Sequence, residues 1–435
     1  NEKEIFKALK KVQKAKKPTV ISCKTKIGYG SPNKSGKASS HGSPLGVDEI
    51  KLVRKALNWK TKPFDIPNKI LNEWRKIGQR GEILEKKWNK ALKRKKIKFN
   101  QTLKNNFTTV LKKEKENAIK EPKSLATRKC SEMTLNALTK QKNNLIGGSA
   151  DLAGSNNTKT KNHKIIKPGD FTGDYIHYGV REHAMSGVMN GIALHSNLIP
   201  YGGTFLIFSD YCKPSIRLSA LMKKRVIYVM THDSIGLGED GPTHQPIEQL
   251  SGLRAIPNLN VFRPADRIET IECWEHALKS SKTPSVLSLT RQNLNPVRKT
   301  YPNKNLCSLG AYEVLRTNKK INLTILASGS EVNLALEVSH KLAKDKIYSK
   351  VISMPCMELF ELQSKSYKNK ILEETKFKIS IEAGSSDCWK KYVGDNGIAF
   401  GIDEFGKSAP YKDIYKYFGL ESTNIKNITK KLLNK

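Results

Sequence analysis

The chain has 435 residues, of which 37% are hydrophobic and 27% are charged, and its formal net charge is +38. This composition excludes a disordered protein, because disordered chains have too few apolar residues to form a core, and the length allows two or three domains. The high positive charge raises nucleic acid or an anionic membrane as a partner. The lysines are spread along the chain and no nucleic-acid-binding motif accompanies them, so we expect solvated surface lysines and no nucleic-acid partner.

The cysteines and the apolar runs indicate the compartment. The seven cysteines form no Cys-x-x-Cys pair and have no metal-ligand spacing with histidine. They predict reduced thiols in a cytoplasmic protein. No apolar run approaches the roughly 20 residues that a membrane-spanning helix needs, so we expect no membrane partner.

The first part of the chain, residues 1–93, combines charged helices with one glycine-rich loop. Its predicted elements are an amphipathic, lysine-rich start, a strand over 18–23, the loop over 28–46, and helices over 48–59 and 67–95. Residues 94–121 are strongly basic and have few apolar positions. This pattern predicts a linker that crosses the surface.

From residue 122 onward, helical patterns alternate with short apolar strands. Strands are predicted near 144–146 and over 226–230, 259–262, 285–290, 323–327, 350–353 and 378–382, and helices over 126–140, 181–195, 207–223, 246–254, 266–279 and 331–344. This alternation predicts an α/β protein with mostly parallel sheets. We therefore expect consecutive α/β units, of which the first is incomplete.

The loop over 231–246 carries the densest group of reactive side chains. It contains two histidines, three acidic residues and three glycines, and it follows the apolar run 226–230 directly. Ligands of parallel sheets bind beyond the carboxyl ends of the strands, so His232, Asp240 and His244 are expected to lie in a crevice. On composition alone, a plain connecting loop is an equally good interpretation.

Four blocks of the sequence, in this order, resemble the transketolases. They are Lys24-Thr-Lys-Ile-Gly-Tyr-Gly-Ser-Pro-Asn-Lys34 with Ser40-His-Gly-Ser-Pro-Leu-Gly46, then Gly147-Gly-Ser-Ala-Asp-Leu-Ala153, Tyr178-Gly-Val-Arg-Glu-His-Ala-Met185, and the loop 231–246. Transketolases use thiamine diphosphate to transfer a two-carbon ketol unit reversibly from a ketose phosphate to an aldose phosphate in the pentose phosphate pathway. The resemblance implies that residues 1–93 are a remnant of the diphosphate-binding domain, residues 122–305 the pyrimidine-binding domain, and residues 306–435 the carboxyl-terminal domain.

One departure from the family pattern concerns the metal. Transketolases hold the diphosphate through Mg²⁺, or Ca²⁺, bound by a Gly-Asp-Gly motif and a downstream asparagine, and no such motif occurs here. We therefore expect that the chain lacks the amino-terminal third of the family and that the metal ligands lie in that missing part, with none in this chain.

The resemblance assigns the cofactor contacts to Glu182, Phe208, Phe205 and His41. A carboxylate at Glu182 would hydrogen-bond to the aminopyrimidine ring and activate the cofactor, and Phe208, with Phe205 nearby, would stack on the ring. Each residue also has a structural interpretation. A glutamate in the first turn of a helix complements the helix dipole, and aromatic residues at helical spacing usually fill a core.

The sugar phosphate is assigned to a set of cations and hydrogen-bonding groups. The resemblance implies that Arg128, Ser155, His232 and Arg291 bind the phosphate and that Asp240 holds a hydroxyl near the reacting carbons. His41 and His244 would contact the reacting oxygens and move protons, which suits a group that titrates near neutral pH. Arginine suits phosphate because its guanidinium binds the anion in a bidentate way.

These expectations define the first hypothesis, a transketolase that works as a homodimer because the family builds each cofactor site between two subunits. Three alternatives stay open. The chain could be a non-catalytic or split fragment that is inactive without a separate amino-terminal part. It could be a dihydroxyacetone synthase, which uses formaldehyde as acceptor, or a basic nucleic-acid binder whose affinity would fall steeply with salt.

Overall fold

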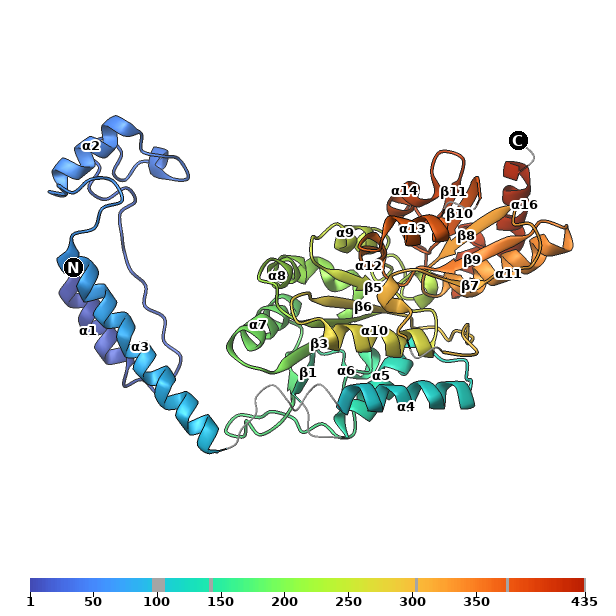
Figure 1. Cartoon of the computed structure of the whole chain (residues 1–435), viewed down its shortest axis with the longest axis horizontal. Coiled ribbons are helices and arrows are strands. Elements are labelled where there is room, and N and C mark those ends of the chain that lie inside the picture. Colours follow the sequence, from blue (N-terminus) through green and yellow to red (C-terminus); the bar gives the residue numbers. More distant parts are fainter. Residues whose placement is uncertain (96–105, 141–143, 302–303, 373–374, 434–435) are drawn as a thin grey trace. The chain divides into compact units, whose positions relative to one another are not determined.

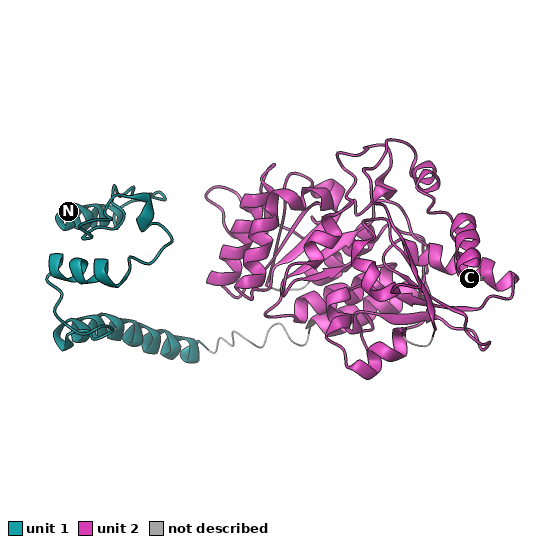
Figure 2. Ribbon diagram, turned by 90° about the horizontal axis from the view of Figure 1, so that it is seen from above, with its two compact units in different colours: residues 1–97 teal, residues 98–435 magenta. Residues whose placement is uncertain are grey.

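The computed structural model describes residues 1–95, 106–140, 144–301, 304–372 and 375–433. The chain divides into two compact units, residues 1–97 (unit 1) and residues 98–435 (unit 2), which Figure 2 shows in different colours. Among the described residues, no helix combines the length and the apolar composition that a membrane crossing requires.

Within the described residues of unit 1, all regular elements are helices, and turns and irregular segments connect them. It contains α1 (Glu2–Val12), the 3-10 helix η1 (Ala38–Ser40), α2 (Val47–Ala56) and α3 (Asn68–Arg94). The strand predicted over 18–23 is wrong, because a strand needs a hydrogen-bonded neighbour and no strand forms within residues 1–95. Neither α1 nor α3 has a buried residue, and Trp74 of α3 is 70% exposed. The described residues of unit 1 therefore form no hydrophobic core of their own.

The segment predicted as a linker, residues 94–121, contains a helix. Residues 96–105 lie outside the described residues, but α4 (Asn106–Lys120) belongs to unit 2 and packs against α5 (Thr127–Thr139) and α10 (Arg267–Lys279). Leu111 of α4 is buried in the core, and Lys115 Nζ lies 3.3 Å from Glu275 Oε2 of α10. The helix was missed because its one apolar face lies among many lysines. The other domain boundaries stay predictions.

Unit 2 begins with a six-stranded sheet in which every pairing is parallel. The strand order is β2-β1-β3-β4-β6-β5. The strands are β1 (Leu145–Ser149), β2 (Tyr175–His177), β3 (Ile199–Phe205), β4 (Ile227–Thr231), β5 (Asn260–Phe262) and β6 (Ser285–Leu289). Strand β4 alternates between two cores: Ile227 and Val229 point to one, Tyr228 and Met230 to the other. A strand buried on both faces explains why its sequence is a continuous apolar run.

Helices cover both faces of this sheet (Figure 1). One face packs against α4, α5 and α10, and the other against α7 (Glu182–His195), α8 (Ser209–Leu221) and α9 (Gln249–Arg254). Short elements connect the strands to these helices: α6 (Ala153–Asn156), η2 (Leu206–Phe208) and η3 (Ile235–Leu237). Loops and short helices cover the side of the sheet that holds the carboxyl ends of the strands. Most of the predicted site residues follow these strand ends.

The second sheet has five strands in the order β11-β10-β8-β9-β7, and only the edge strand β7 is antiparallel. The strands are β7 (Tyr312–Leu315), β8 (Leu323–Ala327), β9 (Ser349–Ser353), β10 (Phe377–Ile381) and β11 (Ile398–Phe400). The remaining elements are η4 (Cys307–Leu309), α11 (Glu331–Lys344), α12 (Met357–Glu361), α13 (Lys365–Leu372), η5 (Asp387–Trp389), α14 (Lys390–Val393), α15 (Tyr411–Tyr417) and α16 (Ser422–Leu433). The predicted fold class, α/β with mostly parallel sheets, is confirmed.

Candidate active site

The centre of the site is His232, which follows the last residue of β4. Its side chain is buried, and its backbone has φ 60°, in the left-handed region that residues other than glycine rarely adopt. Asn156 Nδ2 donates to Thr231 Oγ1 at 2.8 Å, and Thr231 Oγ1 lies 2.8 Å from His232 Nδ1. The Thr231 hydroxyl therefore links Asn156 to the His232 ring and fixes the orientation of the imidazole.

Two phenylalanines from the end of β3 and from η2 lie against the histidines of the loop. The Phe205 ring is 3.8 Å from the His232 ring, and it stacks on Phe208 at 5.7 Å with an interplanar angle of 15°. His244 approaches the same pair, 6.2 Å from Phe205 and 5.6 Å from Phe208. The structure therefore brings both predicted aromatic residues together with His232 and His244.

Two arginines add positive charge beside His232. Arg128, in the first turn of α5, donates to the backbone oxygen of Ser155 at 2.8 Å, and Arg291, two residues beyond β6, donates to Leu237 O at 2.8 Å. Burial and the neighbouring Arg291 guanidinium lower the pKa of Arg128. Burial, Arg128, Arg291 and His244 together lower the pKa of His232 to about 3. The cluster thus holds two cations and a neutral imidazole, an arrangement that favours an anion.

Glu182 stands at the first position of α7, where its side chain is 9% exposed. Within the described residues, its carboxylate has no hydrogen bond or ion pair. It lies beside Cys212 of α8, whose thiol pKa is raised to about 12 by burial, with Glu182 adding to the increase. Cys212 Sγ in turn donates to Phe208 O at 3.7 Å. The carboxylate is therefore available to a ligand that donates a hydrogen bond.

Two further predicted site residues lie at exposed positions. Asp240 is exposed, and its carboxylate makes no hydrogen bond or ion pair with any described residue. His41 belongs to unit 1, where it follows η1 and is exposed. Their predicted roles toward the sugar and the cofactor stay predictions.

The loop that carries His41 is ordered by Glu49, a residue that the sequence analysis missed. Glu49 accepts hydrogen bonds from Ser31 Oγ, from Asn33 N at 2.9 Å and from Asn33 Nδ2 at 3.0 Å. The bonds from Ser31 and Asn33 lower the pKa of Glu49 to about 2. The glycine-rich loop is therefore held in one conformation by a carboxylate from the first turn of α2.

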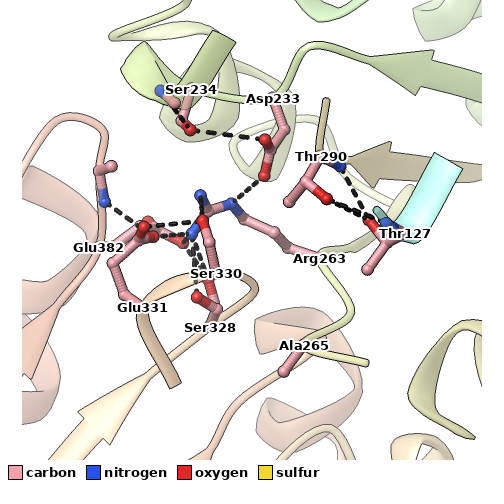
Figure 3. Close-up of polar contacts among 12 residues, drawn as sticks. Thr127, Asp233, Ser234, Arg263, Ala265, Thr290, Ser328, Ser330, Glu331 and Glu382 are labelled. Carbon is pink, nitrogen blue, oxygen red and sulfur yellow. Dashed lines mark hydrogen bonds and ion pairs between the residues drawn. The ribbon is translucent and has the colours of Figure 1, made fainter. Parts of the chain in front are cut away.

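A buried ion network behind His232 was also missed (Figure 3). Arg263, one residue beyond β5, is fully buried and donates from Nε to Asp233 Oδ2 at 2.9 Å. It also donates from Nη1 to Glu331, at the start of α11, and to Ser328 O at 2.9 Å. Because Asp233 directly follows His232, this network ties the loop 231–246 to the second sheet. The only signal in the sequence was an arginine placed straight after an apolar strand.

The network contains further charges that balance one another. Arg254 of α9 binds Glu382 through two hydrogen bonds of 2.7 and 2.8 Å. Burial tends to raise the pKa of Glu382, but Arg254 and Arg263 lower it to about 2. Burial tends to lower the pKa of Arg263. The larger effect comes from the carboxylates of Glu331, Asp233 and Glu382, which raise the pKa of Arg263 above its ordinary value. These residues therefore stay ionised although they are buried.

Thiamine diphosphate has an aminopyrimidine ring at one end and a diphosphate at the other. Glu182 lies beside Cys212, which bonds to Phe208 O. This carboxylate and the stacked Phe205–Phe208 pair fit an aminopyrimidine ring, which has hydrogen-bond donors and a flat face. Among the described residues, no group of three or more histidine, cysteine, aspartate or glutamate side chains could hold a metal ion. The geometry therefore fits the pyrimidine end of the cofactor.

Three domain families match successive parts of the chain. The transketolase thiamine diphosphate binding domain matches residues 1–115, the transketolase pyrimidine binding domain matches residues 123–297, and the transketolase-like carboxyl-terminal domain matches residues 310–421. The prediction that the chain lacks the amino-terminal third is not supported, because the first of these domains is represented. The expectation that the metal ligands lie in a missing part loses its basis for the same reason.

Similar proteins carry the same family name. The chain is 46% identical over 428 residues to the transketolase of Sinorhizobium medicae, a match that covers 97% of this chain and 61% of that protein. It is 40% identical to transketolase 2 of Vibrio vulnificus, covering 100% of this chain and 67% of that protein. The solved transketolase of Leishmania mexicana superposes with a TM-score of 0.87 at 36% identity, covering 100% of this chain and 65% of that chain.

The fold and the matched domains define a protein built like the enzymes that combine a thiamine diphosphate binding domain with a pyrimidine binding domain. The chain belongs to the transketolase family. It spans about two thirds, or slightly less, of the length of the relatives that it matches.

Proposed function

We propose that the protein is a transketolase, which transfers a two-carbon ketol unit from a ketose phosphate to an aldose phosphate with thiamine diphosphate as cofactor and Mg²⁺ or Ca²⁺ as its metal. The observation that carries this proposal is the cluster of Arg128, Arg291 and His232 beside the Phe205–Phe208 pair. A sugar phosphate offers the anion for the first group, and the pyrimidine ring offers a flat surface for the second. The free thiols of all seven cysteines support a cytoplasmic location.

In this mechanism, the chain binds and orients the substrate and moves protons. When bound, thiamine diphosphate supplies a ring that takes up the electrons left as a carbon–carbon bond next to a ketone breaks. Glu182 shares a proton with the aminopyrimidine nitrogen and so sets the protonation of that ring. Arg128, Arg291 and His232 donate hydrogen bonds to the phosphate, which places the other end of the sugar at the aromatic pair.

His41, His244 and Asp240 complete the proposal along the carbon chain of the sugar. His244 lies within reach of the aromatic pair, and its Nδ1 is 3.0 Å from Thr243 Oγ1, so the ring is oriented by its neighbour. We assign to His244, together with His41, the transfer of a proton to or from the reacting oxygen of the sugar. Asp240 would hold a hydroxyl near the reacting carbons, and its exposed carboxylate is free to do so.

The arginine pair provides the test. Changing Arg128 or Arg291 to methionine is expected to weaken binding of ribose 5-phosphate at least tenfold, because each change removes a charge-assisted hydrogen bond to the phosphate. Binding of unphosphorylated ribose should not change. Isothermal titration calorimetry of both sugars measures the difference.

A matched control is Arg316→Met, which removes an arginine paired with Glu313 on β7, away from the cluster. This variant should bind both sugars as the parent chain does. Equal binding of ribose 5-phosphate and ribose by the parent chain would contradict the proposed function.

We also propose that the protein forms a homodimer through α7 and α8. Gly187 and Gly191 of α7 have open space at their Cβ positions, and Leu194 on the same helix is 51% exposed. The neighbouring helix α8 exposes Leu218 and Leu221. Glycines on an exposed apolar face allow a second helix to approach closely.

A bulky charge on this face should separate the subunits. Gly191→Arg is expected to give monomers, measured as molar mass by light scattering after size exclusion, because the arginine would occupy the space of the facing helix. Leu362→Arg is the control, since Leu362 is also exposed but lies beyond α12 in the second sheet's layer. A Gly191→Arg variant with the parent's molar mass would exclude this interface.

A further inference from the structure

Two segments far apart in the sequence are joined by hydrogen bonds directly behind the arginine pair. The residues before and at the start of α5 meet the residues that follow β6. Two backbone hydrogen bonds join these segments, Leu125 N to Leu294 O at 3.1 Å and Leu294 N to Leu125 O at 3.1 Å. Three more join a backbone N–H to a side chain: Ala126 N to Asn293 Oδ1 at 3.0 Å, Thr127 N to Thr290 Oγ1 at 2.9 Å and Thr290 N to Thr127 Oγ1 at 2.8 Å. We call this set the 127–290 junction.

The two threonines at its centre bind each other reciprocally (Figure 3). Both are fully buried, and their hydroxyls lie 3.2 Å apart. No side chain caps the first turn of α5 from its own N-cap residue, Ala126, so the Thr290 hydroxyl does this by accepting from Thr127 N. Thr290 Oγ1 then donates to Gln292 O at 2.9 Å, which leaves its hydrogen bonding satisfied.

Each threonine is followed in the chain by one arginine of the pair. Arg128 follows Thr127, and Arg291 follows Thr290. The two guanidinium groups are close enough that Arg291 lowers the pKa of Arg128. Like charges repel, so the two arginines must be held near each other when no anion is bound. Each guanidinium is anchored to a backbone carbonyl, Arg128 to Ser155 O and Arg291 to Leu237 O. The 127–290 junction is the buried connection between the backbones that carry the two arginines.

We propose that Thr127 and Thr290 are positioning residues that set the separation of Arg128 and Arg291 and thereby the affinity of the site for a phosphate monoester. The proposal rests on the proposed function, in which these arginines bind the phosphate of the sugar. Neither threonine touches the substrate, because both side chains are buried and use their hydroxyls on each other and on Gln292. The junction contributes preorganisation, so the anion does not have to bring the two cations together.

The test removes each hydroxyl while keeping the shape of the side chain. Thr127→Val and Thr290→Val are expected to bind ribose 5-phosphate about tenfold more weakly, because roughly one charge-assisted hydrogen bond to the phosphate would lose its alignment. Both variants should bind ribose as the parent chain does. Thr127→Ser and Thr290→Ser keep the hydroxyl and should keep the parent affinity. Calorimetric titration of the full chain with both sugars gives the values.

The matched control is Thr324→Val in β8. Thr324 Oγ1 lies 2.7 Å from Thr375 Oγ1, so this change also breaks a buried threonine pair, but no arginine of the site is attached to it. The variant should lose thermal stability like the others and keep its affinity for ribose 5-phosphate. Thermal unfolding followed by circular dichroism provides the stability comparison.

Asn293→Ala covers the case in which a valine variant does not fold, because Asn293 is exposed and its loss removes one bond of the junction at the surface. We expect this variant to bind ribose 5-phosphate about threefold more weakly and ribose unchanged.

The proposal is overturned if the folded variants keep the parent affinity, if the serine variants lose as much affinity as the valine variants, or if Thr324→Val weakens binding equally. A parent chain that does not distinguish ribose 5-phosphate from ribose would instead overturn the proposed function and this proposal with it.

Discussion

Changing Glu182 to glutamine is expected to lower turnover of the cofactor-loaded enzyme by about a hundredfold or more, while the KM of the donor ketose phosphate changes by less than about threefold. Glutamine has nearly the shape of glutamate, but it cannot take a proton from the aminopyrimidine nitrogen. Glu182 begins α7, whereas the arginines proposed to bind the phosphate lie in the first turn of α5 and beyond β6, so donor binding should be preserved. Steady-state kinetics with a ketose phosphate and ribose 5-phosphate measure both quantities.

Glu121→Gln is the control for this prediction, because Glu121 is exposed, pairs with Lys123 at the surface, and should leave turnover unchanged. Binding of thiamine diphosphate by the Glu182 variant, measured by calorimetry, separates loss of the cofactor from loss of its activation. Turnover close to that of the parent enzyme in a variant that binds the cofactor would remove Glu182 from the proposed role.

Changing Arg263 to methionine is expected to lower the free energy of unfolding by about 3 to 5 kcal/mol. Arg263 is fully buried and is bound to Asp233 and Glu331, so its loss leaves buried carboxylates without a cation. Methionine fills most of the same volume, and the effect is therefore one of charge rather than of a cavity. Urea unfolding followed by tryptophan fluorescence measures the change.

The same variant should respond to pH in a particular direction. Burial already raises the pKa of Asp233, and removal of the guanidinium that opposes this will raise it further. A carboxyl whose pKa is higher in the folded state than in the unfolded state binds more protons when folded, so stability falls as pH rises. The variant should therefore recover part of the lost stability as the pH falls from neutral toward the ordinary pKa of an aspartate carboxyl.

A surface ion pair serves as the comparison for Arg263. Lys390→Met breaks the exposed pair between Lys390 and Asp387 and should change the unfolding free energy by less than about 1 kcal/mol. If Arg263→Met were no more destabilising than Lys390→Met, the network around Arg263 would not be an important connection between the loop 231–246 and the second sheet.

The elements that the sequence predicted well are those whose local pattern agrees with their final environment. Strand β4 lies within one residue of its predicted position, because a short, β-branched, uninterrupted apolar run favours a strand buried on both faces of a parallel sheet. Helices α7, α10 and α11 follow from apolar residues at helical spacing. Local pattern was sufficient in these cases.

Strand β3 was missed although it lies at the centre of the first sheet. It contains Pro200, Gly202 and Gly203, which locally argue against a strand. The structure supplies the reason for the glycines: a Cβ at Gly202 would lie 2.7 Å from Met189 Sδ of α7, and one at Gly203 would lie 2.7 Å from Thr158 Cγ2. Close packing against neighbouring elements required these residues, and that packing is not visible in the local sequence.

The sequence by itself determined the α/β class, the transketolase resemblance and most of the residues that meet at the site, because motifs and periodicity are local properties of the chain. The tertiary structure alone decided which of those residues are neighbours. It placed Arg128 beside Arg291 through Thr127 and Thr290, and it joined Asp233 to Arg263. Such contacts join strand ends that are far apart in the chain, and only the packing of sheets and helices brings those ends together.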